Sequence, residues 1–118
     1  MAEIEAAERP GQILTRGLIR ALTDQGYAAL SEVTLATGRR VDAMAIDAKG
    51  GISVVEVKSS VADFRSDGKW PEYAEYCDRF FFAVPADFPK EILPAEPGLF
   101  VVDAYGGALI RPAPEHKL

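Results

Sequence analysis

Residues 39–59 carry the pattern that most constrains the fold. The stretches RRVDAMAID and GISVVEVKS each read as a β-strand, and the short segment AKG between them contains a glycine. Apolar and β-branched stretches of this length, separated by a glycine-containing turn, are typical of a β-hairpin. We therefore predict two antiparallel strands joined by a tight turn, and every other element must pack around them.

The remaining segments predict a mixed fold around this hairpin. A polar arm over 1–11 precedes an amphipathic helix, which ends at Gly26, and a strand over 27–38 leads into the hairpin. The segment 60–77 returns to helical spacing with an interruption at Gly68, and RFFFAVP reads as a buried strand. A closing hairpin is predicted around the glycine pair at 106 and 107. The predicted order is α-βββ-α-β with a C-terminal β-hairpin, an α/β or α+β mixed sheet flanked by helices.

Composition limits the class of protein. With 118 residues and 48% hydrophobic content, the chain predicts a single domain over 12–118. One cysteine and one histidine exclude an intrachain disulfide and a zinc site of ordinary spacing, so any metal must be held by oxygen. The acidic N-terminus and the short apolar runs predict a cytoplasmic protein. The net charge of −5 argues against wrapping nucleic acid by bulk electrostatics.

The register of the hairpin decides whether two acids meet. If residues 47–51 form a five-residue loop, Ile46 pairs with Ile52 and Met44 with Val54. Asp42 then lies across from Glu56, with Cβ atoms about 5 Å apart. An even-length loop without a bulge would put the two acids on opposite faces.

The face that carries these acids is apolar at one end and ionic at the other. Asp42, Glu56 and Lys58 continue a face that begins with isoleucine, methionine and valine. Two facing carboxylates repel each other unless a cation or Lys58 neutralises them. A divalent cation is one partner of this kind, and ordinary ion pairs on a solvated surface are the alternative.

An acid on one strand followed by Glu-x-Lys on the next resembles the PD-(D/E)xK nuclease superfamily. More closely, GRRVDAMAI, VVEVKSSVADFRSDGKWPEYAEYCDRFFFAVP and DAYGGALIRPAP resemble the MmcB-like family of bacterial DNA repair proteins, from about residue 12 onward. The resemblance implies a restriction-endonuclease-like core. It also implies a DNA repair function, with Mg²⁺- or Mn²⁺-dependent hydrolysis of phosphodiester bonds in branched or damaged DNA.

The resemblance also implies roles for individual residues. Asp42 and Glu56 would be the metal-binding carboxylates, Val57 would offer its main-chain carbonyl, and Lys58 would act near the attacking water. Val41 stands where the superfamily's name has proline, which is not a ligand. Glu32 is our candidate for a further catalytic acid, with a rim carboxylate as the alternative.

Several other residues are candidate substrate contacts. Arg16 and Arg20 are one turn apart on the first helix. On the second helical segment we assign Trp70, Ala74 and Cys77 to the core and expect Lys69 and Tyr73 to face the site or solvent. The predicted substrate contacts are Arg16, Arg20, Arg40, Lys69 and Tyr73.

Three functions of different class remain open at this point. The first is a metal-dependent nuclease in DNA repair, and the second is a non-catalytic DNA-binding or partner-recruiting module with the same fold. The third is an interaction domain whose acids form surface ion pairs. Asp63 and Asp67 are expected to be acids at a helix start. A homodimer or a larger repair complex is expected because the domain is small.

Overall fold

The computed structural model describes residues 9–68 and 70–116, so most of the predicted N-terminal arm lies outside the described residues. The observed elements follow the predicted order. They are α1 (Pro10–Asp24), β1 (Ala28–Thr34), β2 (Arg40–Ile46), β3 (Ile52–Val57), α2 (Val61–Ser66), α3 (Trp70–Tyr73), η1 (Ala74–Tyr76), β4 (Arg79–Val84), η2 (Lys90–Ile92), β5 (Gly98–Val102) and β6 (Gly107–Arg111).

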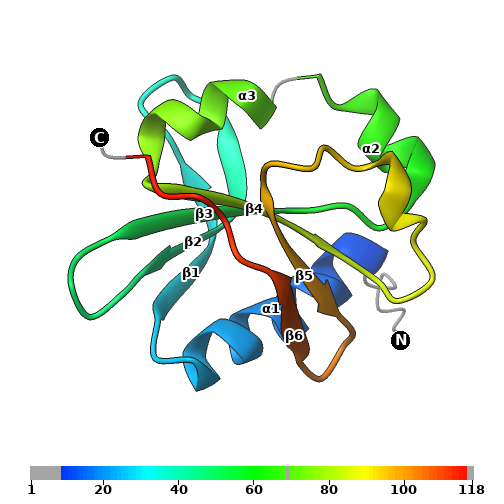
Figure 1. The fold of residues 1–118 in the computed structure, drawn as a ribbon, viewed down its shortest axis with the longest axis horizontal. Helices are drawn as coiled ribbons and strands as arrows, with labels where there is room; N and C mark the ends of the chain where they lie inside the picture. Colours follow the sequence, from blue (N-terminus) through cyan, green and yellow to red (C-terminus); the bar gives the residue numbers. More distant parts are fainter. Residues whose placement is uncertain (1–8, 69, 117–118) are drawn as a thin grey trace, which may run out of the picture.

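The strands form one mixed sheet whose spatial order follows the sequence, β1-β2-β3-β4-β5-β6. The first three strands are antiparallel, β4 is parallel to both β3 and β5, and β6 turns back antiparallel to β5. Figure 1 shows α1 against one face of the sheet and the short helices α2 and α3 against the other. The mixed α/β fold, the flanking helices and the C-terminal hairpin are therefore confirmed.

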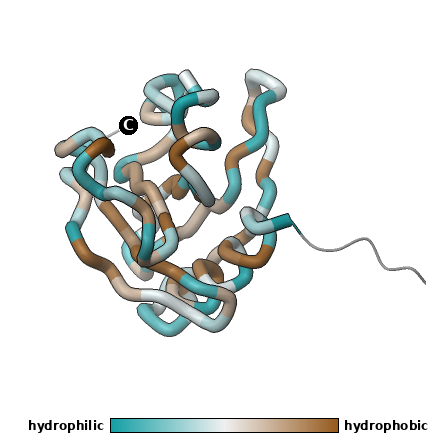
Figure 2. The backbone as a smooth tube through the Cα atoms, turned by 90° about the vertical axis from the view of Figure 1, so that its right-hand side faces the viewer, coloured by the Kyte–Doolittle hydropathy of each residue, from teal (hydrophilic) through white to brown (hydrophobic). Residues whose placement is uncertain are grey.

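Each face of the sheet has its own hydrophobic core. The face under α1 buries Leu14, Leu18 and Leu22 of the helix against Val55 and Phe100. The opposite face buries a second cluster, which α2 and α3 cover and which includes Val54, Phe80, Phe82, Cys77 and Leu93. In Figure 2 hydrophobic residues follow the strands and α1, while most connecting loops are hydrophilic. Neighbouring residues of β3 thus serve opposite cores, and the middle of the sheet is covered on both sides.

The position of α1 on the sheet depends on one glycine. Gly17 lies so close to the turn between β5 and β6 that a Cβ atom there would stand 1.7 Å from the carbonyl oxygen of Asp103. Only a residue without a side chain permits this approach. The helix is therefore fixed against both the sheet and this turn. None of the described helices is long and apolar enough to cross a membrane.

Candidate active site

The loop between β2 and β3 sets the predicted register. Asp47 Oδ1 accepts hydrogen bonds from the N–H groups of Lys49 and Gly51, both at 2.8 Å, and Gly50 has a positive φ of 84°. An aspartate that caps its own turn, followed by a glycine in the left-handed region, is a stable short connection. Ile46 pairs with Ile52, so the loop spans five residues and the expected parity is confirmed.

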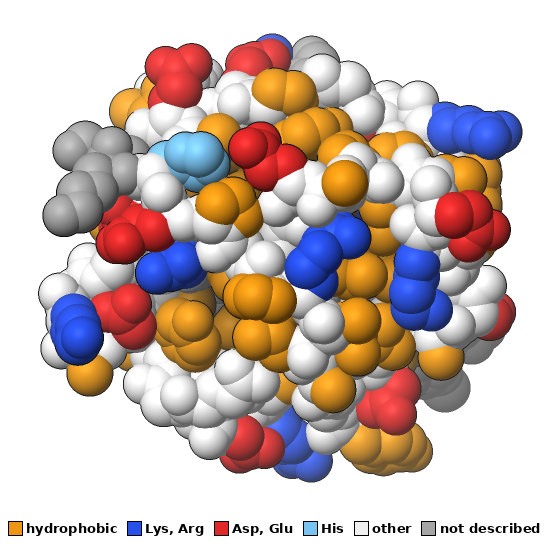
Figure 3. Space-filling model, in the orientation of Figure 1, with side chains coloured by type: hydrophobic (Ala, Val, Ile, Leu, Met, Phe, Trp, Pro, Cys, Tyr) orange, Lys and Arg blue, Asp and Glu red, His pale blue; other side chains and the backbone are white. Residues whose placement is uncertain are grey.

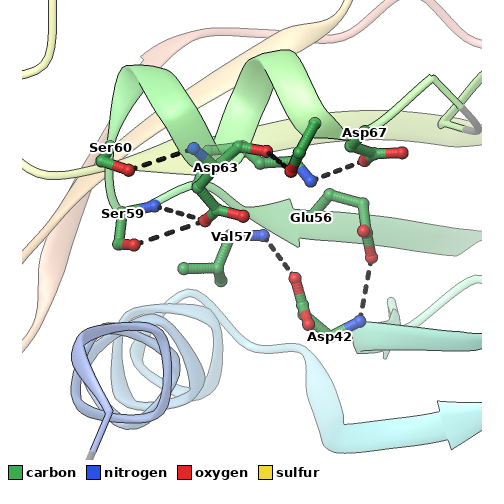
Figure 4. Close-up of polar contacts among 9 residues, drawn as sticks. Asp42, Glu56, Val57, Ser59, Ser60, Asp63 and Asp67 are labelled. Atoms are coloured by element: carbon green, nitrogen blue, oxygen red, sulfur yellow. Dashed lines mark hydrogen bonds and ion pairs between the residues drawn. The ribbon is translucent and has the colours of Figure 1, made fainter.

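Asp42 and Glu56 meet where β2 and β3 separate. The regular ladder ends one pair earlier, at Ala43 and Val55. Beyond it the Asp42 N–H donates to Glu56 Oε2 at 2.9 Å, and the Val57 N–H donates to Asp42 Oδ2 at 2.8 Å. These two reciprocal hydrogen bonds replace the main-chain pairing and hold both carboxylates between the strands, as Figure 4 shows.

The main-chain carbonyl of Val57 faces the same gap. The N–H of Lys58 donates to the carbonyl of Ala83 on β4 at 2.9 Å. In a trans peptide the carbonyl of one residue points opposite to the N–H of the next. The Val57 carbonyl therefore points away from β4, toward the side of β3 on which Asp42 stands.

Lys58 is buried and paired with an acid that follows α2. Its Nζ forms an ion pair with Asp67 Oδ2, and only 6% of the Lys58 side chain is exposed. The expectation that Asp67 is a helix-start acid is wrong, because α2 ends at Ser66 and Asp67 follows it. Its carboxylate therefore orients the lysine and does not interact with the start of a helix.

Asp63 does lie in the first turn of α2, as predicted. The Ser60 Oγ accepts from the Asp63 N–H at 3.1 Å, and Asp63 Oδ2 accepts from the Ser59 N–H at 2.9 Å. This arrangement caps the helix and fixes the chain immediately after Lys58. Figure 4 shows Asp63 beside the Asp42–Glu56 pair, where it adds a further negative charge.

Burial perturbs both central carboxyl groups. It raises the pKa of Glu56 to about 8, with the neighbouring Asp42 charge as the next cause; the hydrogen bond from the Asp42 N–H and the charge of Lys58 act in the opposite direction. Burial also raises the pKa of Asp42, against the hydrogen bond from the Val57 N–H and the charge of Lys58. The pair thus lacks enough nearby positive charge to ionise fully.

These residues fit a hard divalent cation. Two carboxylates and one main-chain carbonyl converge on one gap, and oxygen is the ligand that Mg²⁺ prefers. The raised pKa values show a shortage of positive charge that a cation would remove. Within 9–68 and 70–116 no three His, Cys, Asp or Glu side chains are grouped as a metal site. The predicted ligand set of Asp42, Glu56 and Val57 needs only two such side chains.

Glu32 lies within β1, not at its start as expected. The register of the sheet places it next to the Asp42–Glu56 pair. Its neighbours Ser31 and Val33 pair with Ala43 and Val41, which puts Glu32 beside Asp42. Glu32 has a φ of 56°, a conformation that is unusual for a residue with a side chain and often marks a functional position. Its carboxylate lies 3.5 Å from the Arg40 guanidinium, and both side chains are more than half exposed.

A cleft of about 520 Å³ contains the pair. Asp42, Glu56, Val57 and Lys58 line its floor. Its walls include the N-terminal residues of α1 and residues from β1, β2 and the start of α2: Arg9, Pro10, Gly11, Gln12, Thr15, Glu32, Arg40, Ser59 and Asp63. The predicted catalytic residues are therefore brought to one opening. Sequence reasoning missed the contribution of the first turn of α1, for which the sequence gives no local signal.

The predicted substrate contacts divide into three groups. Arg40 lines the cleft, whereas Arg16 and Arg20 line a neighbouring groove on the outer side of α1. Tyr73 is only 7% exposed and packs in the core with Cys77, so it does not face solvent; the 3-10 turn that continues α3 makes side chains three residues apart eclipse. Burial and then the charge of Glu56 raise the pKa of its phenol, so the expectation that Tyr73 faces the site stays a prediction. Lys69 lies outside the described residues.

Trp70 packs in the core, as predicted, and stacks on Phe80 with ring centroids 5.4 Å apart.

Charges on the outer surface are mixed. Figure 3 shows acidic, basic and hydrophobic side chains interspersed on the face that it presents. The net charge of −5 is therefore not gathered there into one continuous acidic surface.

Comparisons with known proteins agree with the fold. The family described as DNA repair protein MmcB-like matches residues 4–118. A solved structure, the SPO1766 protein of unknown function from Silicibacter pomeroyi, is 50% identical with a TM-score of 0.91 over 96% of this chain and 77% of that one. No curated protein matches the chain.

Two further solved structures are more distant. A repair endonuclease from Pyrococcus abyssi is 18% identical, with a TM-score of 0.47 over 74% of this chain and 42% of that one. The structure of an EndoMS–dsDNA2 complex is 23% identical, with a TM-score of 0.48 over 79% of this chain and 44% of that one.

Proposed function

Because the chain belongs to the MmcB-like family of DNA repair proteins, we propose that it is a Mg²⁺- or Mn²⁺-dependent endonuclease that hydrolyses phosphodiester bonds in branched or damaged DNA. The observation that carries this proposal is the pair formed by the half-buried Asp42 and the buried Glu56 in an open cleft. We place the activity in the bacterial cytoplasm.

The residues of the site divide the chemistry among them. Asp42, Glu56 and the Val57 carbonyl would hold the cation. The bound cation supplies a nucleophilic water at neutral pH and offsets charge on the phosphate. Lys58, oriented by Asp67, places a positive charge beside the pair, where it stabilises the charge that develops on the phosphate oxygens. Glu32, exposed at the rim, would accept a proton from the attacking water.

A non-catalytic DNA-binding module is the second candidate, and one observation favours it. The Nζ of Lys58 is already engaged by the Asp67 carboxylate. A lysine held in this way contributes less to the reaction than one directed at the phosphate, and a protein with such a lysine could bind DNA without cutting it.

Metal-dependent cleavage separates the two candidates. Purified protein is incubated with branched, single-stranded and duplex DNA in Mg²⁺, in Mn²⁺ and in EDTA, and the Asp42→Asn and Glu56→Gln variants are run in parallel. Both amides keep an oxygen that can accept the existing hydrogen bond, so the variants should fold. Cleavage by the wild type alone, and only with metal, supports the nuclease. DNA binding without cleavage in any metal supports the second candidate.

Stability provides a readout that does not depend on activity. A cation that binds the native site raises the melting temperature by mass action. We expect this increase for the wild type and its absence in Asp42→Asn. A metal response of equal size in both proteins would show that the cation binds elsewhere. Self-association, the other expectation, is measured by light scattering.

A further inference from the structure

A second groove lies beside the candidate cleft, along α1. It has a volume of about 790 Å³ and is lined by Arg16 and Arg20 of α1, by Ser31 of β1, and by Ala104 and Tyr105 of the turn between β5 and β6. Gln12, Thr15 and Glu32 line both openings. The two openings are therefore neighbours, and a polynucleotide bound in the groove would lie next to the cleft.

The cleft and the groove differ in their charges. The cleft holds Asp42, Glu56 and Asp63 together with the cations Arg9, Arg40 and Lys58, whereas the groove holds two arginines, and Glu32, which lines both, forms an ion pair with Arg40. Among residues 9–68 and 70–116 the Arg20 guanidinium has no hydrogen bond or ion pair, and its side chain is exposed. Arginine in an open groove next to a phosphodiester-cleaving site suits the phosphates of a polynucleotide.

An exposed aromatic ring stands on the opposite wall. Tyr105 is 78% exposed, the largest fraction among the exposed large hydrophobic residues that the structure describes. Water-facing aromatic rings beside cations are the usual means of holding single-stranded nucleic acid, because each base can stack on the ring. The bases of a duplex are stacked on each other and cannot use such a ring.

The turn that carries Tyr105 is rigid. Asp103 Oδ1 accepts hydrogen bonds from the N–H groups of Tyr105 and Gly106 at 2.8 and 3.0 Å, and the Asp103 N–H donates to the Gly106 carbonyl at 2.8 Å. The close approach of Gly17 fixes this turn against α1. Gly17 lies between Arg16 and Arg20 in the sequence of that helix. The main chain that carries Tyr105 is therefore fixed relative to the helix that carries the arginines before any ligand arrives.

We propose that this groove binds single-stranded DNA that leads to the catalytic cleft, with Tyr105 stacking on a base and Arg16 and Arg20 contacting phosphates. The substrate of the proposed nuclease would then have a single-stranded segment next to the bond that is cut. This inference rests on the proposed function only for the identity of the nucleic acid, and it can be tested without cleavage.

The test is binding of a fluorescein-labelled dT12 oligonucleotide by fluorescence anisotropy in EDTA, where the proposed cleavage cannot occur. We expect Tyr105→Ala to weaken binding roughly 5- to 100-fold, the range for loss of one stacked base, and Tyr105→Phe to bind like the wild type. Arg20→Ala should lower the slope of log affinity against log salt by about 0.7. Arg65→Ala, an exposed arginine on α2 across the sheet, is the control for charge alone and should leave that slope unchanged.

The outcomes are distinct for the two proposals. Tyr105-dependent binding together with absent cleavage would retain the groove and remove the nuclease. Metal-dependent cleavage together with wild-type affinity in both Tyr105→Ala and Arg20→Ala would overturn the groove alone. The groove assignment also fails if the wild type does not bind dT12, or if a 12-base-pair duplex binds more tightly than the single strand. Thermal unfolding of each variant establishes that the exposed substitutions leave the fold intact.

Discussion

Replacing Glu56 by glutamine should make the metal-free protein more stable at alkaline pH. The pKa of Glu56 is raised from 4.5 to about 8 in the folded protein. Between these values the native state binds more protons than the unfolded chain, so the free energy of unfolding falls as pH rises. Glutamine does not titrate, and its amide oxygen can still accept the hydrogen bond from the Asp42 N–H.

The expected change in the free energy of unfolding follows from the raised pKa of Glu56. A pKa increase from 4.5 to about 8, at about 1.4 kcal/mol per pH unit, corresponds to roughly 5 kcal/mol. Asp42 occupies the same gap and titrates together with Glu56, which divides the effect between them. We therefore expect Glu56→Gln to exceed the wild type by on the order of 2–4 kcal/mol at pH 8.5, and to approach it at pH 4.5.

The assay is equilibrium unfolding in urea at a series of pH values in EDTA. Glu75→Gln is the control, because this glutamate is exposed on η1 and should not change the pH dependence. Adding Mg²⁺ should stabilise the wild type at pH 8.5 and leave Glu56→Gln nearly unchanged. The reasoning is refuted if the two proteins show parallel pH profiles, or if glutamine destabilises the fold equally at both ends of the range.

Three further results are expected. Gly17→Ala should destabilise the protein by about 2–3 kcal/mol in urea unfolding, because its Cβ would meet the Asp103 carbonyl. Gly11→Ala is the control: no atom lies within 4 Å of the new Cβ, so this variant should be neutral or stabilising. Equal effects of the two substitutions would contradict the close approach of Gly17 to the turn. Lys58→Met should cost about 3 kcal/mol because it removes the positive charge that forms an ion pair with the half-buried Asp67 carboxylate, and adding Asp67→Asn should recover part of this loss. Strict additivity in a double-mutant cycle would argue against the pair. Burial raises the pKa of the Cys77 thiol to about 11. A disulfide reagent at pH 8 should therefore label Cys77 only when the protein unfolds, and rapid labelling of the native protein would contradict this burial.

The hairpin and its site could be predicted because their determinants are local. Parity of the loop over 47–51 places Asp42 opposite Glu56 once both strands are recognised, and the pairing of Met44 with Val54 confirms that register. The alternation of β3 likewise puts Glu56 and Lys58 on one face. The five-residue loop and the apolar face of the hairpin both favour this same register.

Other features depend on how distant segments meet, and the sequence carries no signal for them. The partner of Lys58 is set by the path of the chain after α2, nine residues later, which brings Asp67 back to it. The burial of Tyr73 depends on the change from α3 to a 3-10 turn after four residues. Tyr105 is brought to α1 by the turn after β5, which Gly17 contacts closely.

The unusual backbone of Glu32 also affects how the molecule meets its own copies. β1 is at the margin of the sheet, where exposed strands offer hydrogen-bonding groups to any extended chain nearby. A left-handed residue at the fifth of its seven positions breaks the run of evenly spaced donors and acceptors into two short pieces. A strand of another molecule can therefore not pair with β1 along its whole length. The backbone conformation that brings the Glu32 carboxylate to the cleft thus also disfavours aggregation through this edge strand.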